Sequence, residues 1–271
     1  MVSIYGEIEK ALQAGETVAL ATVINVRGSA PRKVGAKMLI RPDGSILSSI
    51  GGGALEATVI EAAKEAIKTG QPRLVHYGLR ADQHKGHLGV CGGDVDVFID
   101  VIKPQPTLLL VGGGHVGRYL AEMAHLLGFR ILVVDDREDF ASPDRFPHAE
   151  KILLGEIESR LEEVPISPDT YVVIATRSHE QDALALERVI NSPAAYIGLL
   201  GSRRKVALIF KALREKGVSE ERLAEVHAPI GLDIGAETPE EIAVSILAEM
   251  VLLRRGGTGK PLSAIVREGQ Q

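Results

Sequence analysis

The sequence lacks several features, and each absence excludes a class of protein. Among 271 residues there is one cysteine, which excludes a framework of internal disulfides. No stretch approaches the roughly 18 consecutive apolar residues of a membrane-spanning helix. The first residues carry acids where a signal peptide needs a basic region followed by a long apolar run. We therefore expect a cytoplasmic protein with no membrane partner.

Basic side chains are also fewer than acidic ones. The chain has 31 basic against 36 acidic side chains, a net charge of −5, and no Lys/Arg-rich run. This balance argues against a nucleic-acid surface. The charge balance does not exclude anionic small molecules as ligands, because backbone amides at the start of a helix bind anions without a net positive charge.

Two prolines in three positions, Pro104 and Pro106, mark the boundary between two expected domains. Residues 1–103 predict a small α+β domain. Helical spacing over residues 4–12 and 54–68 alternates with strand-like runs at 18–26, 37–41, 45–50, 73–79 and 95–102. Pro42 and Gly44 suit a tight hairpin turn between the second and third of these runs.

Residues 107–271 predict a doubly wound, Rossmann-like α/β domain. Apolar runs at 107–111, 130–135, 151–154, 171–175 and 195–200 are separated by helical stretches. Such continuous apolar strands are typical of a parallel sheet that is covered by helices on both faces.

A dinucleotide-binding fingerprint begins this second domain. Gly112, Gly114 and Gly117 form a GxGxxG pattern between the strand at 107–111 and a helix at 119–127. In that pattern the glycines permit a tight turn, close approach of a pyrophosphate and close helix packing. Asp135 follows at the end of the next strand, where an acid accepts ribose hydroxyls and favours NAD over NADP. NAD, another nucleotide or a lost ligand all fit this pattern, and His115 needs no chemical role.

Two later loops are rich in cations at the carboxyl ends of strands, where open α/β sheets bind their ligands. Residues 176–182 contain Arg177, His179 and Asp182, which are candidates for anion binding or acid–base chemistry, although Ser178 with Gln181 also fits a capping box. Residues 198–205 end in Ser202, Arg203 and two further cations at a helix start, a pattern that suits a phosphate or carboxylate. Thr238 to Glu241 is a second capping box, with Pro239 at the first helical position.

The first domain offers a second anion site. Gly51, Gly52 and Gly53 lead into a helix with no side chains to block its amides, and residues 28–32 bring Arg32 as a cation. Further on, His84, His87 and Cys91 have a spacing that invites a zinc site but lack a fourth ligand. Cys91 beside two glycines fits an accessible reactive or metal-binding thiolate, and a lone cysteine also fits a small buried apolar residue.

Several motifs in one order resemble the XdhC/CoxI family of xanthine dehydrogenase accessory factors. These motifs are residues 28–32 with 35–38, 49–53 with Leu55 and Glu56, 91–93, 112–117, 135–137, 176–182, 198–204 and 228–249. The resemblance implies a chaperone that carries the molybdenum cofactor, molybdopterin, as cargo. It also implies a cysteine desulfurase and a molybdenum hydroxylase such as xanthine dehydrogenase as partners. The implied reaction step is support of cofactor sulfuration and insertion, without turnover by the chain itself.

The resemblance and the residue patterns together give the candidate sites. Cys91 is the candidate molybdenum ligand, or alternatively a sulfur relay, and His179 and Asp182 are the candidates for any catalysis. The cofactor-binding candidates are Ser29, Arg32, Gly51, Gly52, Gly53, Glu56, Cys91, Gly112, Gly114, Gly117, Asp135, Arg177, Ser202 and Arg203. An NAD-dependent oxidoreductase and an NAD-sensing regulatory protein are the alternatives, and we expect a homodimer.

Overall fold

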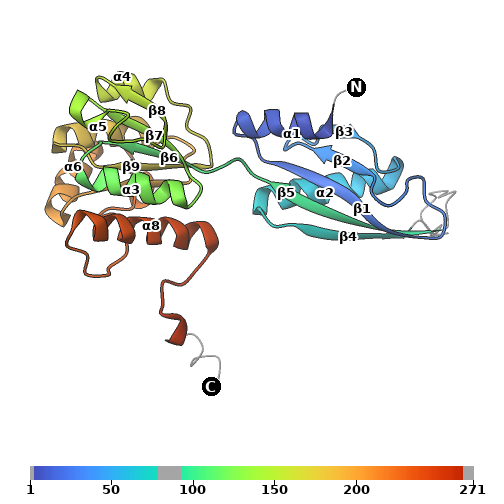
Figure 1. The fold of residues 1–271 in the computed structure, drawn as a ribbon. Coiled ribbons are helices and arrows are strands. Elements are labelled where there is room, and N and C mark those ends of the chain that lie inside the picture. Colours follow the sequence, from blue (N-terminus) through green and yellow to red (C-terminus); the bar gives the residue numbers. More distant parts are fainter. Residues whose placement is uncertain (1–2, 79–92, 265–271) are drawn as a thin grey trace. The chain divides into compact units, whose positions relative to one another are not determined.

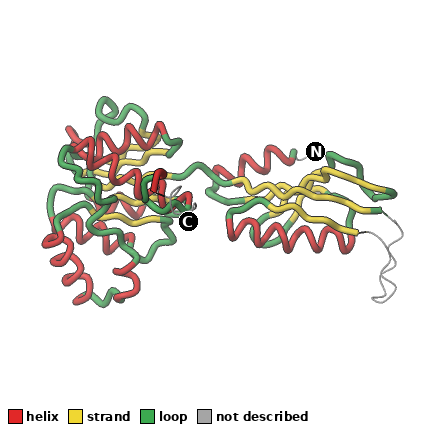
Figure 2. Tube along the Cα trace, turned by 90° about the horizontal axis from the view of Figure 1, so that it is seen from below, coloured by secondary structure: helices red, strands yellow, loops and turns green. Residues whose placement is uncertain are grey.

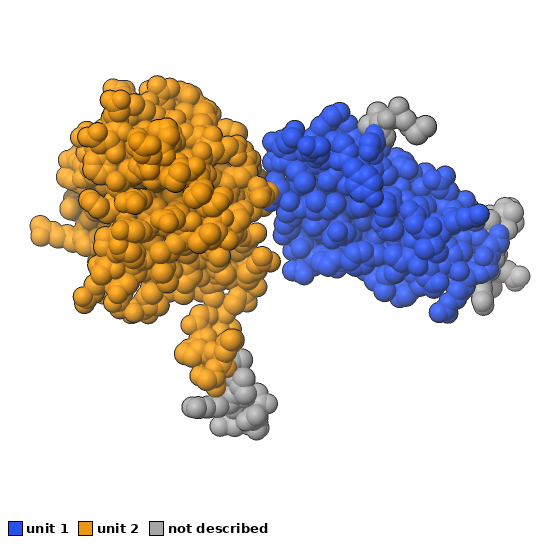
Figure 3. Space-filling view, viewed as in Figure 1, with its two compact units in different colours: residues 1–104 blue, residues 105–271 orange. Residues whose placement is uncertain are grey.

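The computed structural model describes residues 3–78 and 93–264. The chain divides into two compact units, residues 1–104 and 105–271, which are coloured separately in Figure 3. Both units have the predicted fold class. Within the described ranges, no helix combines the length and the apolar character needed to cross a membrane.

The first unit is a five-stranded antiparallel sheet with the strand order β3-β2-β1-β5-β4 (Figure 1). Helix α2 lies along the sheet, and its buried positions Leu55, Val59, Ala63 and Ala66 follow helical spacing. The hairpin at Gly44 is confirmed, with φ at +85° and the Gly44 amide donating to the Arg41 carbonyl at 2.9 Å. The elements are α1 (Ile4–Gln13), β1 (Val18–Arg27), β2 (Lys37–Ile40), β3 (Ile46–Ser48), α2 (Gly53–Thr69), β4 (Arg73–Gly78) and β5 (Asp94–Ile102).

The second unit is a five-stranded parallel sheet with the order β10-β9-β6-β7-β8, the arrangement of a Rossmann half-sheet extended by two strands. Figure 2 shows helices on both sides of its strands. Its elements are β6 (Thr107–Val111), α3 (His115–Leu126), β7 (Arg130–Asp135), the 3₁₀ helix η1 (Glu138–Phe140), β8 (Ala149–Leu154), α4 (Ile157–Glu162), β9 (Thr170–Ile174), α5 (His179–Val189), β10 (Tyr196–Leu199), α6 (Arg203–Glu215), α7 (Glu220–Ala224) and α8 (Pro239–Arg255).

The apolar strands of this unit supply two cores. In β6, Leu108 and Leu110 join the core formed with α3 and α8, whereas Leu109 and Val111 join the core formed with α4, α5 and α6. A strand covered on both faces needs apolar side chains at every position. This is why the run at 107–111 shows no alternation.

One connection differs from the prediction of helical stretches between all strands. The chain from β7 to β8 contains only the short 3₁₀ helix η1 and otherwise irregular structure. Pro143 and Pro147 lie within it, and each removes an amide donor and disfavours a helical conformation before it. The resulting loop lies beside α3 and the glycine-rich turn.

Candidate functional site

The turn from β6 to α3 has the geometry that the glycine pattern predicts. Gly112 has φ at +111°, and a Cβ there would overlap the Ala175 carbonyl group. A Cβ on Gly117 would lie 2.5 Å from the Gly112 carbonyl oxygen, so helix α3 packs closely on the turn. Around Gly114 an added Cβ would meet no atom within 4 Å in the part of the chain that the structure describes. Gly114 is therefore the position at which a ligand could approach the backbone.

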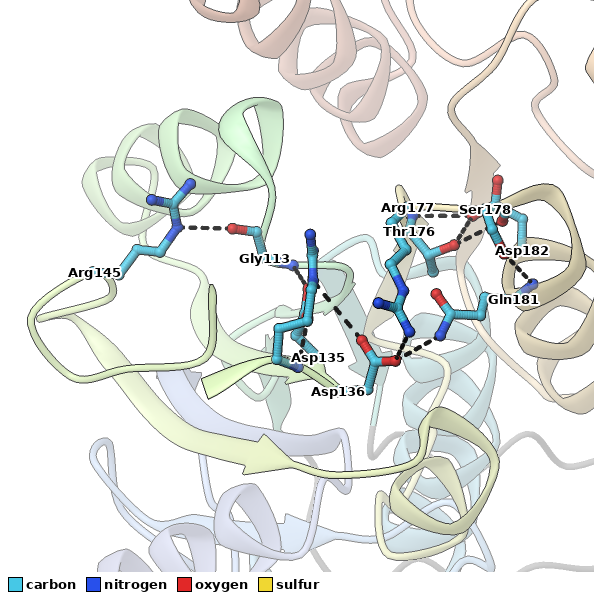
Figure 4. Close-up of polar contacts among 10 residues, drawn as sticks. Gly113, Asp135, Asp136, Arg145, Thr176, Arg177, Ser178, Gln181 and Asp182 are labelled. Carbon is cyan, nitrogen blue, oxygen red and sulfur yellow. Dashed lines mark hydrogen bonds and ion pairs between the residues drawn. The ribbon is translucent and has the colours of Figure 1, made fainter. Parts of the chain in front are cut away.

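The remaining glycine of the turn is covered by the β7–β8 connection. A Cβ on Gly113 would overlap the Phe140 carbonyl oxygen. The Gly113 amide donates to Asp135 Oδ2 at 2.7 Å, and its carbonyl accepts from Arg145 Nε at 2.8 Å (Figure 4). The chain itself thus binds both polar groups of this peptide.

The carboxylate of Asp135, the predicted ribose-binding acid, accepts hydrogen bonds from neighbouring residues of the chain. Its Oδ1 accepts from the Arg137 amide at 3.0 Å and from Arg137 Nε at 2.9 Å, and its Oδ2 accepts from Arg137 Nη2 at 2.8 Å as well as from Gly113. These four bonds use the roughly four acceptor positions of a carboxylate. Burial opposes the charged form, but the hydrogen bonds from Arg137 and Gly113 outweigh it and lower the pKa of Asp135 below its ordinary value of 3.8. No acceptor is left for a ribose hydroxyl in this conformation.

A second carboxylate links the ends of two strands. Asp136 Oδ2, just after β7, accepts from Arg177 Nη2 and from Gln181 Nε2, each at 2.7 Å (Figure 4). Arg177 and Gln181 follow β9, and β6 lies between β7 and β9 in the sheet. We call these contacts the Asp136 bridge. It spans the point at which the strand order reverses, which is where this fold class binds nucleotides.

The Asp136 bridge also explains why one capping prediction is only half right. The Ser178 hydroxyl accepts from the Gln181 amide at 3.2 Å, so Ser178 caps α5 as expected. The Gln181 side chain, however, goes to Asp136 rather than back to the start of the helix. In contrast, the predicted capping box of Thr238 and Glu241 at α8 is confirmed.

The starts of α5 and α6 line one pocket at the carboxyl edge of the sheet. Its cations are Arg177, Arg204 and Lys205, and α6 has no acidic residue in its first turn. Backbone amides of a first turn carry partial positive charge, so cations placed there repel it unless an anion binds. We call this site the α5–α6 pocket; its full lining is Arg177, Ser178, His179, Ser202, Arg204, Lys205 and Leu208.

The two residues proposed for acid–base chemistry lie in different environments. Asp182 is fully buried; its Oδ1 accepts from the Thr176 amide at 2.9 Å and the Thr176 hydroxyl at 2.6 Å, and its Oδ2 pairs with Lys205 Nζ. Asp182 therefore ties the β9 loop to α6 and holds Lys205 at the pocket. The His179 ring is 61% exposed, lines the pocket, and lies 3.1 Å from Glu180 Oε1. Arg203 is exposed and lies outside the lining.

In the first unit, the amides predicted to bind an external anion bind Glu56. Its Oε1 accepts from the Ser49 hydroxyl at 2.6 Å and from the amides of Ile50, Gly51 and Gly52 at 2.9, 3.2 and 2.9 Å. Burial works against the charged carboxylate, but these hydrogen bonds outweigh it and lower the pKa of Glu56 below 4.5. An added Cβ on Gly52 or Gly53 would meet no atom of the described residues within 4 Å.

Three separate motifs of the first unit nevertheless come together. Pro31 lies on Gly51, because a Cβ there would be 2.5 Å from Pro31 Cγ. A Cβ on Gly93 would lie 2.5 Å from the Arg27 carbonyl oxygen and 2.6 Å from that of Ser29. Ser29 and Arg32 are exposed in this loop. The predicted roles of Cys91, His84 and His87 fall outside the described residues.

Two residues of the second unit's site, Arg145 and Asp136, are not among the candidate residues predicted from the sequence, although Asp136 lies in the motif at 135–137. Arg145 lies in an irregular loop, and Asp136 is adjacent to the acid that the fingerprint selects. A general signal exists only for Asp136, because a second acid at a strand end in this fold class faces the same crevice.

The comparisons with known proteins agree with this architecture. A family model described as the XdhC Rossmann domain matches residues 108–250, and one described as the XdhC and CoxI family matches residues 11–78. A crystal structure described as a xanthine dehydrogenase from Bacillus halodurans superimposes with a TM-score of 0.52 at 23% identity, over 97% of this chain and 99% of that one, and supports the fold.

Curated relatives align over most of the chain. The uncharacterized protein YqeB of Escherichia coli is 43% identical over 95% of this chain, which spans only 47% of YqeB. A Bacillus subtilis protein named as a probable xanthine dehydrogenase subunit is 24% identical over 92% of this chain and 96% of its own length. The molybdenum cofactor insertion chaperone PaoD of Escherichia coli is 26% identical over 90% of this chain and 86% of its own. The chain belongs to the XdhC family, and its second unit is an XdhC Rossmann domain.

Proposed function

We propose that the chain is a chaperone for the molybdenum cofactor. In this proposal it holds the cofactor while a terminal sulfido ligand is added and then supports its insertion into a xanthine dehydrogenase-type molybdenum hydroxylase. The cofactor is cargo, and the chain performs no turnover of its own. The relatives named above as a cofactor insertion chaperone and as a probable xanthine dehydrogenase subunit support this role.

The α5–α6 pocket is the observation that carries the proposal. A pterin cofactor bears a phosphate, and the pocket offers the amides of two helix starts together with Arg177, Arg204 and Lys205. The Ser178 and Ser202 hydroxyls each accept the third amide of their helix. Capping satisfies only some of the orphan donors of a helix start. The first turn of α6 has no acidic residue to compete for its first amides, whereas the Glu180 carboxylate accepts from its own amide at the start of α5. Phosphate chemistry fits this donor set.

The glycine-rich turn makes a nicotinamide dinucleotide a poorer candidate. An NAD-dependent oxidoreductase or NAD sensor would need Asp135 as an acceptor, and Arg137 and Gly113 already use its oxygens. The Asp136 bridge lies across the crevice that the dinucleotide would enter. We therefore place the cofactor's phosphate in the α5–α6 pocket, with Gly114 as the open backbone position of the turn.

The remaining parts of the proposal concern partners. Cys91 would ligate the molybdenum or relay sulfur supplied by a cysteine desulfurase, since a thiolate suits a soft metal and is a good nucleophile. The convergence of Ser29, Gly51 and Gly93 in the first unit supports a cofactor contact beside the cysteine motif. We expect a cytoplasmic homodimer, and the exposed apolar side chains of α8, Val244, Val251 and Leu253, offer a surface for it.

The test is anaerobic purification from a host that produces the cofactor, with molybdenum and oxidised-pterin fluorescence measured per chain. The wild type should carry near-stoichiometric pterin. Arg204→Gln should lose most of it, because Arg204 is an exposed cation that lines the pocket. The matched control is Arg214→Gln, at the opposite end of the same helix, where the guanidinium pairs with Glu220.

Cys91→Ala separates the two units' contributions. We expect this variant to keep pterin but to lose molybdenum or the sulfido ligand, and to fail in activating a molybdenum-free hydroxylase. Wild-type protein without pterin, under conditions that load PaoD, would contradict the proposal. Equal pterin in Arg204→Gln and Arg214→Gln would contradict the assignment of the α5–α6 pocket.

A further inference from the structure

A second pocket of the Rossmann unit lies away from the α5–α6 pocket, between α3 and the β7–β8 connection. We call it the α3 pocket. Arg118 and Glu122 reach it from α3, and Asp144, Arg145 and His148 reach it from the connection. It exists because the connection is a loop rather than a helix packed flat against α3. No part of the proposed chaperone role uses it.

Two arginines, Arg118 and Arg145, and two acids, Glu122 and Asp144, line the α3 pocket, so its formal charge is balanced. Among the described residues, neither Arg118 nor Arg145 forms an ion pair with a carboxylate. Arg145 donates through Nε to Gly113, but its Nη2 is inaccessible to solvent and has no acceptor among residues 3–78 and 93–264. Buried guanidinium groups normally have partners, so an orphaned one indicates a missing acceptor. Burial, together with the nearby charges of Arg118 and Arg137, lowers the pKa of Arg145.

The position of Arg145 is fixed by the loop around it. Its guanidinium lies 4.9 Å from the centre of the Phe140 ring, with the Arg137 guanidinium at 3.8 Å from the same ring. Arg137 is neutralised by Asp135. Arg145 is therefore the cation of this group that is held in place without a counter-ion, and rigid positioning lowers the entropy cost of binding one.

Part of the remaining lining is apolar. Ile131, Phe146 and Ala121 line the pocket and belong to the core beneath it. His148, at its edge, stacks on His125 with ring centres 4.1 Å apart and nearly parallel planes. Such walls bury a planar ring, whereas a bare inorganic anion would gain nothing from them.

We propose that the α3 pocket binds a small molecule in which a planar ring carries an oxyanion, with Arg118 and Arg145 as the cationic contacts. Phosphate and carboxylate share this chemistry, since both accept paired N–H donors from guanidinium groups. The ring would lie against Phe146 and beside His148. This site is independent of cofactor binding at α5–α6.

The experiment uses the full chain and three probes: AMP for a ring phosphate, benzoate for a ring carboxylate, and inorganic phosphate without a ring. Binding is measured by calorimetry and by NMR of ¹⁵N-labelled arginine and histidine side chains. We expect AMP or benzoate to saturate, with shifts at Arg145 Nε and the His148 ring. Arg118→Gln should weaken that binding by about tenfold to a hundredfold, the effect of losing one charge-assisted hydrogen bond.

Arg118 is the primary variant because it is exposed and forms no ion pair among the described residues, so its replacement should leave the fold intact. Arg145→Gln is the second variant, with circular dichroism to verify folding. Arg204→Gln, in the other pocket, is the matched control and should bind the probe like the wild type. AMP alone binding assigns a phosphate, and benzoate alone assigns a carboxylate.

Three results would overturn the inference. One is the absence of saturable binding by both ring probes. Another is an equal affinity of the wild type and Arg118→Gln for the probe. The third is inorganic phosphate binding as tightly as AMP, because the ring would then contribute nothing. None of these results bears on pterin retention by Arg204, so failure here is distinguishable from failure of the chaperone proposal.

Discussion

The Arg137 guanidinium donates to both carboxylate oxygens of Asp135, from Nε to Oδ1 at 2.9 Å and from Nη2 to Oδ2 at 2.8 Å. A dinucleotide ribose must break this bidentate pair to reach the acid. We predict that calorimetric titration of the wild type with NAD gives a Kd no tighter than about 1 mM. Arg137→Ala removes the two side-chain donors to Asp135 and leaves the two backbone donors, and it should bind NAD more tightly than the wild type.

A matched control keeps the acid occupied. Arg160→Ala removes a half-buried arginine of α4 that pairs with Glu163 and donates to the Leu154 carbonyl, and it should leave NAD affinity unchanged. Micromolar binding of NAD to the wild type, or weaker binding to Arg137→Ala, would show that the Asp135 pair opens readily and would return the nucleotide-binding alternatives to consideration.

The same pair predicts a pH dependence of stability. Because the pKa of Asp135 is lower in the folded chain than its ordinary value of 3.8, its contribution is complete above that value and is lost as the pH falls through the folded pKa. Asp135→Asn should reduce the free energy of unfolding at neutral pH by about 1.5–3 kcal/mol. The difference from the wild type should shrink in urea denaturation below the ordinary pKa. A difference that is constant from neutral to acid pH would contradict the assigned cause.

In the first unit, Glu56→Gln tests whether the carboxylate organises the glycine-rich turn. The charge that receives three amides and the Ser49 hydroxyl would be lost. We expect a loss of about 1.5–3 kcal/mol in the free energy of unfolding, because hydrogen bonds to a charged group are worth about this much. Glu61→Gln is the control on the same helix, since its side chain is 74% exposed and pairs with the neighbouring Lys64. Equal stability of the two variants would refute the organising role.

Asp182→Ala tests the buried support of the α5–α6 pocket. It leaves Lys205 without its partner and the Thr176 amide and hydroxyl without an acceptor. Breaking such a buried pair should cost about 3 kcal/mol in thermal or urea denaturation. Glu180→Ala changes an acid in the same helical turn that is exposed, and should have little effect. If Asp182→Ala keeps wild-type stability and loses only pterin, Asp182 acts on the ligand instead.

The fold was largely predictable because its signals are local. The apolar run at β6, the helical spacing of α2 and the capping box of Thr238 each depend on residues close in sequence. The sequence predicts a helical stretch between β7 and β8, whereas the connection is a loop. Pro143 and Pro147 disfavour a helix there and could have indicated the loop. Element type follows from such short-range patterns, whereas the path of an irregular connection does not.

The site was less predictable, because spacing does not reveal whether a donor is already satisfied. The amides of Gly51 and Gly52 and the acid Asp135 have the pattern of ligand contacts, yet each binds a group of the chain itself. Whether these groups are bound within the chain depends on where the side chains of Glu56 and Arg137 point, which residue spacing does not determine. The α5–α6 pocket, by contrast, follows from two helix starts that the sequence shows directly.

Arg177 takes part in two sets of contacts. Its guanidinium lines the α5–α6 pocket and also donates to Asp136 across the end of β6. An anion that draws Arg177 into the pocket competes with Asp136 and loosens the link between β7 and α5. By thermodynamic reciprocity, whatever detaches Asp136 strengthens the pocket's hold on its anion. We therefore expect anion binding in the pocket and release of the Arg177–Asp136 contact to be coupled through this side chain.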